Sequence, residues 1–166
     1  MESQSEFNQI FHYDPPTGSL TWKINTGFKR MIGKAAGKKD AKGYLVVGCL
    51  KKDYRVHRIV WVMVNGVIPD GMQIDHINGV KSDNRISNLR LVCPQDNQKN
   101  MAIPRSNSSG VIGVGWDNKT SRWRAKIMVN RKTIHLGRFD TLEAASTARK
   151  KAEHRYGFHS NHGRTP

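Results

Sequence analysis

The chain carries near its middle the run Ile74-Asp75-His76-Ile77-Asn78-Gly79, in which an acid and an imidazole stand side by side before a glycine-containing turn. Two asparagines, Asn88 and Asn97, follow shortly afterwards. A carboxylate oxygen can hold a divalent cation, and an amide oxygen can add a neutral ligand. Histidine can take a proton from water near neutral pH because of its unperturbed pKa. These residue types together indicate metal-assisted hydrolysis of a phosphodiester bond.

The pattern around this run predicts a strand, a loop, a second strand and a helix. The strand, loop and second strand are predicted at residues 73–77, 78–84 and 86–92. Pro94 favours the start of a helix that carries Asn97. Because neighbours on a regular strand point to opposite faces, Asp75 and His76 can serve one site only if the strand ends or twists there.

The segments before this run predict a β-rich region. Residues 20–24 alternate like a strand, and residues 44–50 and 54–57 are predicted as a hairpin across residues 51–53. The wholly apolar run at residues 58–64 is compatible with a buried strand or with a buried helix.

Residues 25–42 are predicted as a glycine-rich basic loop in which six Lys or Arg stand against one acid, Asp40. Exposed cations displace counterions from a phosphate backbone, so phosphate contact is favoured over a merely solvated loop. The residues predicted to make this contact are Lys29, Arg30, Lys34, Lys38 and Lys39.

The overall charge also favours a polyanionic partner. The formal net charge is +15, from 28 Lys and Arg against 13 Asp and Glu, and nucleic acid is the usual partner for such an excess. A ribosomal or membrane-surface protein could have the same total.

The two cysteines, Cys49 and Cys93, form no Cys-x-x-Cys pair, which argues against a disulfide scaffold or zinc ribbon and fits a reducing cytoplasm.

A cytoplasmic location, without membrane contact, is the expectation for this chain. Residues 1–6 are polar and acidic, with no apolar signal region. The longest apolar run, at residues 59–64, is too short to span a bilayer.

Residues 110–157 predict a three-stranded antiparallel sheet packed on one helix. Residues 122–127 alternate basic and apolar, so a strand there would bury Trp123, Ala125 and Ile127. Residues 133–136 repeat the alternation. The opposite, basic face suits the major groove of DNA. The residues predicted to contact DNA from this module are Trp116, Arg122, Arg124, Lys126 and Arg131.

The helix of this module has predicted ends. Asp140 is predicted as its N-cap, with Glu143 three residues later as in a capping box. Small and apolar residues then recur at helical spacing from Leu142 to Tyr156, and Gly157 suits a C-terminal cap.

Two parts of the chain resemble known families. Residues 74–100 resemble the His-Asn-His (HNH) endonucleases, particularly the homing endonucleases of phages and introns, through the runs Asp75-His76-Ile77-Asn78-Gly79 and Asp83-Asn84-Arg85-Ile86-Ser87-Asn88-Leu89-Arg90 and through Asn97. Residues 13–22 and 54–58 look like the lead-in of phage members. Residues 110–157 are similar to the apetala-type DNA-binding domain of ethylene-response factors. The resemblance implies an α+β chain with a ββα-metal finger, and a helix at residues 58–64.

The HNH resemblance also implies roles for four residues. Asp75 matches the metal-ligating acid and His76 the general base. Asn88 matches the asparagine that braces the loop and orients the histidine. Asn97 matches the third letter of the motif, where many members have His, and is expected to be a second metal ligand. Neutral oxygen ligands favour one Mg²⁺ or Mn²⁺ per site.

The sequence therefore predicts a site-specific, divalent-metal-dependent DNA endonuclease that nicks one strand or makes paired cuts. The expected partner is double-stranded DNA, bound by a monomer or weak dimer without a small-molecule cofactor. Arg85 and Arg90 are expected to hold phosphate, and His57 is expected to pack in the core rather than to catalyse. The alternatives are a catalytically silent DNA-binding regulator and a basic RNA-binding protein.

The predicted parts are a nuclease domain at residues 1–100 with its finger at 73–101, a linker at 101–109, a DNA-binding domain at 110–157 and a frayed tail at 158–166.

Overall fold

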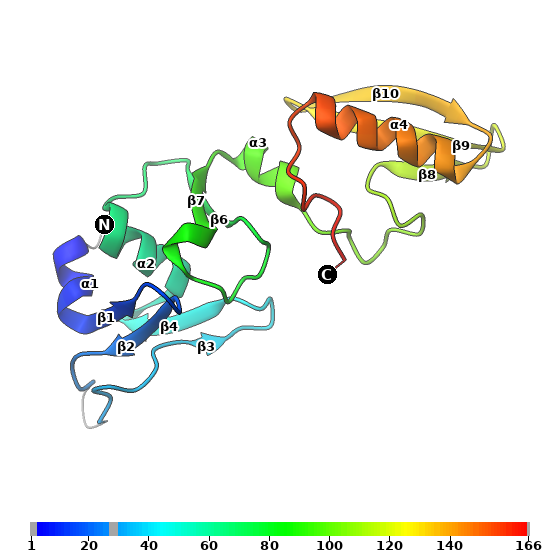
Figure 1. The fold of residues 1–166 in the computed structure, drawn as a ribbon. Coiled ribbons are helices and arrows are strands. Elements are labelled where there is room, and N and C mark those ends of the chain that lie inside the picture. Colours follow the sequence, from blue (N-terminus) through cyan, green and yellow to red (C-terminus); the bar gives the residue numbers. More distant parts are fainter. Residues whose placement is uncertain (1–2, 27–29, 166) are drawn as a thin grey trace. The chain divides into compact units, whose positions relative to one another are not determined.

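The computed structural model describes residues 3–26 and 30–165, and the chain divides into two compact units, Met1–Pro94 and Gln95–Pro166 (Figure 1). Each unit combines helices with small antiparallel sheets, which confirms the predicted α+β class. The division follows Pro94, whereas the sequence predicted a nuclease domain that extends to residue 100. In the part of the chain that the structure describes, no helix is long and apolar enough to cross a bilayer.

The N-terminal unit contains three small antiparallel sheets, one of which carries the acid and histidine at its strand end. The first is a β1–β2 hairpin, the second has the order β3-β4-β5, and the third pairs β6 with β7. Its strands are β1 (Phe11–Asp14), β2 (Ser19–Trp22), β3 (Lys38–Lys39), β4 (Leu45–Cys49), β5 (Lys52–Arg55), β6 (Gln73–His76) and β7 (Leu89–Val92).

The predicted β4–β5 hairpin is present, but its turn lies earlier than expected. Leu50 and Lys51 are the turn residues, with φ of 51° and 61°. Two consecutive residues with positive φ match the twist of a two-residue hairpin, which residues 51–53 would not.

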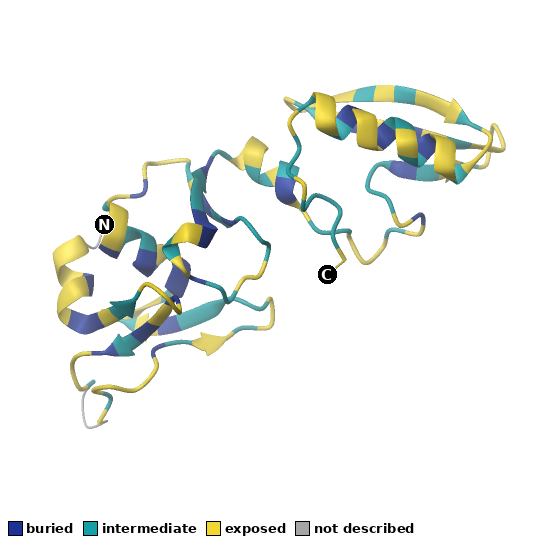
Figure 2. Ribbon diagram, viewed as in Figure 1, coloured by how far each residue is buried: buried dark blue, intermediate teal, exposed yellow. Residues whose placement is uncertain are grey.

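The apolar run after this hairpin is a helix, α2 (Val56–Asn65). Strand β5 ends at Arg55, so His57, which was predicted in a strand, is helical. The buried residues Val56, Ile59, Val60 and Met63 recur at helical spacing and pack into the core of this unit (Figure 2).

A short N-terminal helix, α1 (Gln4–Ile10), was not predicted. Ser3 and Glu6 form a capping box at its start, and Phe7 and Ile10 bury themselves in the same core as α2. The Ser-x-x-Glu spacing ahead of these apolar residues is a sequence signal that could have found this helix.

The C-terminal unit has the predicted three-stranded antiparallel sheet packed on one helix. The sheet order is β10-β9-β8, and Val114, Ala125 and Ala145 are buried where α4 meets it. The elements are α3 (Pro94–Asn97), a 3₁₀ turn (Gln98–Asn100), β8 (Val114–Asp117), β9 (Arg122–Val129), β10 (Lys132–Phe139) and α4 (Leu142–Arg155).

Helix α4 begins one residue later than predicted. Thr141 is the N-cap, and its side chain accepts a hydrogen bond from the backbone N–H of Ala144 at 3.1 Å. Asp140, the predicted cap, forms an exposed ion pair with Arg122 instead. The predicted role of Gly157 agrees with its φ of 65° directly after the last helical turn.

The C-terminal segment, expected to be a frayed tail, is held by hydrogen bonds. The backbone N–H groups of His159 and Gly163 donate to the carbonyls of Lys99 and Met101. The guanidinium of Arg164 donates to the carbonyl of Asn100 at 2.7 Å. Residues 158–165 are therefore packed against the segment that opens the same unit.

Replacing the cap of α4 should destabilise that helix specifically. We expect Thr141→Ala to cost about 1 kcal/mol, because one backbone N–H at the helix start loses its acceptor. Hydrogen exchange of the α4 amides in the full chain measures this. Asp140→Ala is the matched control and should leave the exchange rates unchanged, since an exposed ion pair adds little stability. The opposite ranking of the two variants would contradict the assignment of the cap.

Candidate active site

The β6–β7 ribbon positions both members of the Asp75–His76 pair. Asp75 lies opposite Arg90 in the strand register, and the guanidinium of Arg90 donates to its Oδ2 at 2.8 and 3.0 Å. Strand β6 ends at His76, whose side chain is buried with 4% exposure. The strand end is therefore at the position that the sequence required.

His76 is held by Asn84, which was predicted only as part of a loop. The Nε2 of His76 lies 3.1 Å from the Oδ1 of Asn84, and Asn84 is 1% exposed. An amide oxygen only accepts, so Nε2 carries the proton and the lone pair of the neutral ring lies on Nδ1. This contact, which fixes both the ring and its tautomer, could not be read from the spacing of the motif.

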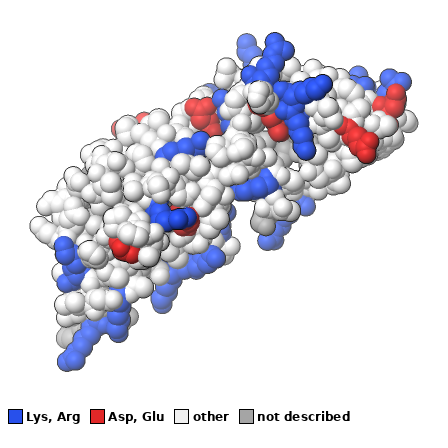
Figure 3. Space-filling view, viewed as in Figure 1, with Lys and Arg blue, Asp and Glu red and all other residues white. Residues whose placement is uncertain are grey.

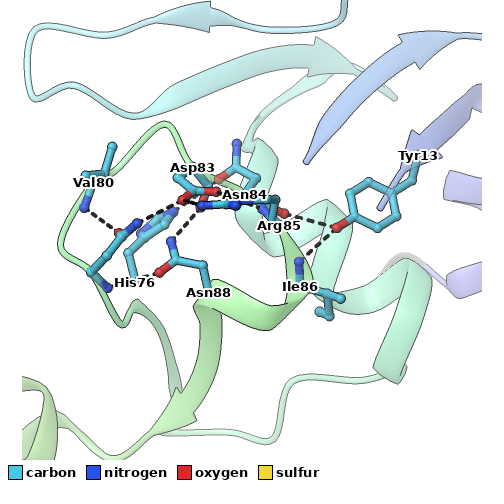
Figure 4. Close-up of polar contacts among 9 residues, drawn as sticks. Tyr13, His76, Val80, Asp83, Asn84, Arg85, Ile86 and Asn88 are labelled. Atoms are coloured by element: carbon cyan, nitrogen blue, oxygen red, sulfur yellow. Dashed lines mark hydrogen bonds and ion pairs between the residues drawn. The ribbon is translucent and has the colours of Figure 1, made fainter. Parts of the chain in front are cut away.

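Asn88 braces the loop that carries Asn84 (Figure 4). Its Oδ1 accepts from the backbone N–H of Asn78 at 3.0 Å, and its Nδ2 donates to the carbonyl of Asp83 at 2.8 Å. The side chain of Asn78 in turn donates to Asp83 at 2.8 Å. Asn88 thus bonds to the loop, and Asn84 on that loop contacts the His76 ring.

Aromatic rings surround His76 within the N-terminal unit. The ring of His57 lies edge-on to it, with centroids 4.9 Å apart, and the ring of Tyr44 is 6.0 Å away. The cations of Arg55 and Lys81 lie over the ring of Tyr44, at 4.2 and 5.0 Å from its centroid. His57, expected to pack in the core, is buried, but it lies in α2 and not in a strand.

Burial controls the protonation of both histidines. Burial lowers the pKa of His76, while the hydrogen bond to Asn84 and then the charge of Asp75 oppose that shift. Burial, followed by the nearby His76 and Arg55, lowers the pKa of His57 to about 3. A lowered pKa keeps His76 in the neutral form that can accept a proton.

The arginines expected to hold phosphate are paired with acids in this structure. Arg85 donates to both oxygens of Asp83, at 2.8 and 2.6 Å, and this side-chain hydrogen bonding lowers the pKa of Asp83 to about 2. Arg90 is paired with Asp75. Both arginine side chains remain partly exposed, so a phosphate can share them.

The predicted basic loop exposes its cations. Lys29 lies outside the described residues, whereas Arg30, Lys34, Lys38 and Lys39 are all exposed. On the face drawn in Figure 3, Lys and Arg side chains clearly exceed Asp and Glu. The surface of this loop therefore suits a polyanion.

The donor chemistry fits a hard divalent cation. Within residues 3–26 and 30–165, no three His, Cys, Asp or Glu side chains gather as a metal-binding cluster. Mg²⁺ usually keeps several waters and takes one or two carboxylates together with substrate phosphates, so the single carboxylate of Asp75 is compatible with it. Asn97, the predicted second ligand, ends α3 and is described with the C-terminal unit.

The outer face of the C-terminal sheet is basic, as predicted. Arg122, Arg124 and Lys126 are exposed on β9, and Arg131 is exposed in the β9–β10 turn. A hollow of about 460 Å³ lies on this face. Residues of β10, which were not predicted as DNA-binding residues, also line this hollow. Its lining is Arg122, Arg124, His135, Gly137 and Arg138.

Trp116 lies on the other side of this sheet. It pairs with Trp123 across β8 and β9, and the two rings meet edge-on with centroids 5.3 Å apart. Since Trp123 packs beside Ala125 toward α4, Trp116 extends the helix-covered face, although it is 49% exposed.

Comparison with known proteins gives consistent matches. A family model described as HNH endonuclease matches residues 54–99. Protein 3.8 of Escherichia phage T7 is 38% identical over 92 residues, which are 55% of this chain and 76% of that protein. An uncharacterized HNH endonuclease of Acanthamoeba polyphaga mimivirus is 32% identical over 126 residues, which are 75% of this chain and 60% of that protein.

A solved structure also matches. The HNH homing endonuclease I-HmuI, described for its binding and cleavage of DNA, shares 25% identity with a TM-score of 0.46, over 60% of this chain and 55% of that one. The chain thus spans less than two thirds of the mimivirus protein and of I-HmuI. The class of protein is a DNA-cleaving enzyme, an endodeoxyribonuclease. The chain belongs to the HNH endonuclease family.

The buried histidines predict how stability depends on pH. The pKa of His57 is about 3 in the folded chain and near 6.5 in the unfolded chain, so between these values only the unfolded state binds the proton. The stability that the neutral His57 contributes to the N-terminal unit is therefore fully present above about pH 6.5. It is lost progressively as the pH falls below that value. Denaturation midpoints at several pH values measure this.

His57→Leu should weaken that dependence, with a remainder from His76, whose pKa is also lowered. His12→Leu replaces an exposed histidine and serves as the control that keeps the wild-type slope. An unchanged slope in His57→Leu would show that the side chain of His57 does not stay neutral on folding.

Proposed function

We propose that the protein is a site-specific endonuclease of the homing type, which cleaves double-stranded DNA with the help of a divalent metal ion. The observation that carries the proposal is the contact between His76 and Asn84 at the end of the strand that bears Asp75. A histidine oriented in this way, beside a carboxylate, can combine a base with a metal ligand.

His76 acts as the general base. Its lone pair takes a proton from the water that attacks phosphorus, and the hydrogen bond to Asn84 keeps the ring in place during the transfer. Asn88 contributes as the brace of the loop, through its bonds to Asn78 and Asp83. General-base catalysis is typically worth about 10²–10⁴-fold in rate.

Asp75 and Asn97 are proposed to hold one Mg²⁺ or Mn²⁺, Asp75 through a carboxylate oxygen and Asn97 through an amide oxygen. When bound, such an ion neutralises charge that develops on the phosphoryl group and on the departing oxygen. Arg90, now paired with Asp75, and Arg85, paired with Asp83, are proposed to share their donors with the phosphates flanking the cut.

Binding is proposed to use two basic surfaces. The exposed cations at residues 30–39 grip backbone near the cut. The C-terminal sheet, as an apetala-type module, reads base edges with Arg122, Arg124 and Lys126, while Arg131 holds phosphate. A single site in a monomer most simply nicks one strand, and a weak dimer on DNA would allow paired cuts.

Removal of the base should abolish cleavage without abolishing binding. We expect His76→Ala to lower the nicking rate at least about 10²-fold, because no other group replaces the proton acceptor. The substrate is a pool of supercoiled plasmids with random inserts, incubated with Mg²⁺ or EDTA, and the nicked ends are sequenced. His12→Ala, in the same unit but exposed, is the control.

Open circles formed only with metal and only by wild type and His12→Ala would support the proposal. Clustered ends would support site specificity, and linear product would indicate paired cuts. Equal cleavage by His76→Ala would rule out His76 as the base. Cleavage in EDTA would rule out the metal.

The outer face of the C-terminal sheet should govern affinity rather than chemistry. We expect Arg124→Ala to weaken DNA binding and to make the slope of log affinity against log salt shallower by about 1, with the single-turnover rate at saturation unchanged. Fluorescence anisotropy at several salt concentrations measures this. Lys151→Ala, exposed on α4, is the control for loss of one charge. Equal effects of both variants would argue against a role for this face.

A further inference from the structure

The β1–β2 hairpin makes direct contact with the loop that orients His76, although it precedes the residues 54–99 matched by the family model. The hydroxyl of Tyr13, in β1, accepts a hydrogen bond from the backbone N–H of Ile86 at 2.9 Å. The same hydroxyl donates to the carbonyl of Asn84 at 3.3 Å. Figure 4 shows Tyr13 reaching this loop from a separate strand.

The turn of the same hairpin touches the same peptide bond. A Cβ placed on Gly18 would lie 2.3 Å from the backbone nitrogen of Arg85 and 2.6 Å from the carbonyl carbon of Asn84. Gly18 also has a φ of 73°, which strains any residue with a side chain. Only glycine allows the hairpin to rest on the Asn84–Arg85 backbone in this way.

Asn84 is thus fixed from two directions. Its backbone is held by Tyr13 and approached closely by Gly18, while its side chain, 1% exposed, reaches the Nε2 of His76. The hydroxyl of Tyr13 keeps its proton, and with it the ability to donate, because burial raises the pKa of Tyr13. A displacement of the Asn84 backbone would therefore be passed directly to the His76 ring.

We propose that Tyr13 is a positioning residue for the nuclease reaction: with Gly18 it clamps the Asn84 backbone so that the amide of Asn84 holds His76 in its reactive tautomer. The proposal rests on the function of His76 argued above, and it makes the N-terminal hairpin a working part of the active site. Tyr13 acts through the backbone of Asn84 and not on the reacting atoms.

A double-mutant cycle tests the coupling. Tyr13→Phe keeps the ring and removes the hydroxyl, and should lower kcat about tenfold with KM for DNA unchanged. In the Asn84→Ala background the same change should lower kcat less than about twofold, because the link to His76 is already broken. Tyr156→Phe, in the C-terminal unit, is the control for loss of a hydroxyl. An equal tenfold loss in both backgrounds, or a rise in KM alone, would overturn the proposal.

A measurement without DNA separates this inference from the proposed function. The ¹⁵N signals of labelled histidines report which ring nitrogen of His76 carries the proton, in the full chain at about pH 7.5 where a neutral ring is expected. Wild type and Tyr156→Phe should show the Nε2-protonated form, and Asn84→Ala a mixture of tautomers. Tyr13→Phe should shift toward that mixture.

If Tyr13→Phe folds and leaves the His76 signals as in wild type, the clamp is disproved whatever the enzyme cleaves. If the signals shift but His76→Ala still cuts DNA, the clamp stands and the catalytic role of His76 fails. Gly18→Ala provides a second variant from the same hairpin, and it should move the His76 signals in the same direction as Tyr13→Phe.

Discussion

The hydrogen bond between Asn84 and His76 depends on a loop that is held by hydrogen bonds among its own side chains and backbone. A buried amide without a partner is costly, so a loop that packs against a core is stable only when its side chains and backbone bond one another. Asn88 meets this requirement with a donor and an acceptor bond, and Asn78 with a bond to Asp83. The same bonds that stabilise the loop therefore define where Asn84 lies, and so where the His76 ring lies.

The charges of the N-terminal unit are arranged in two groups with different surroundings. Near the candidate site, Arg85 and Arg90 are held by Asp83 and Asp75 at hydrogen-bonding distance, so the charges of these two arginines are offset. Away from it, the lysines at residues 34–39 are exposed. A phosphate backbone would thus be attracted more strongly by these exposed lysines than by the two paired arginines.

The C-terminal sheet shows a related arrangement. Arg122 and Arg138 form ion pairs with Asp140 and Asp117, but more than half of each arginine side chain is exposed. Exposed pairs of this kind contribute little stability, so exchanging the carboxylate for phosphate or a base edge costs little. The acids therefore contact these arginines without holding them strongly.

Local signals in the sequence predicted the parts of the fold that depend on neighbours in the chain. The alternation at residues 122–127 predicted β9, and Pro94 predicted the start of α3, because side-chain period and proline geometry act over a few residues. Errors arose where two local signals compete. Asp140 and Thr141 are both good N-caps, and the backbone course after β10 selects Thr141.

The role of Asn84 could not be predicted for a different reason. Its residue type is as common in a plain loop as in a site, and what distinguishes it is a hairpin 71 residues earlier in the chain. A contact between residues so far apart in the chain leaves no periodic pattern and no local motif in the sequence. Its one trace is the glycine at position 18, where a side chain would collide with the backbone of residues 84 and 85. In the proposed mechanism the motif supplies the reacting groups, and a β-hairpin outside it contacts the loop that carries Asn84. A segment cut to the motif alone would therefore keep Asn84 beside His76 but would lose the contacts of Tyr13 and Gly18 with the Asn84 backbone.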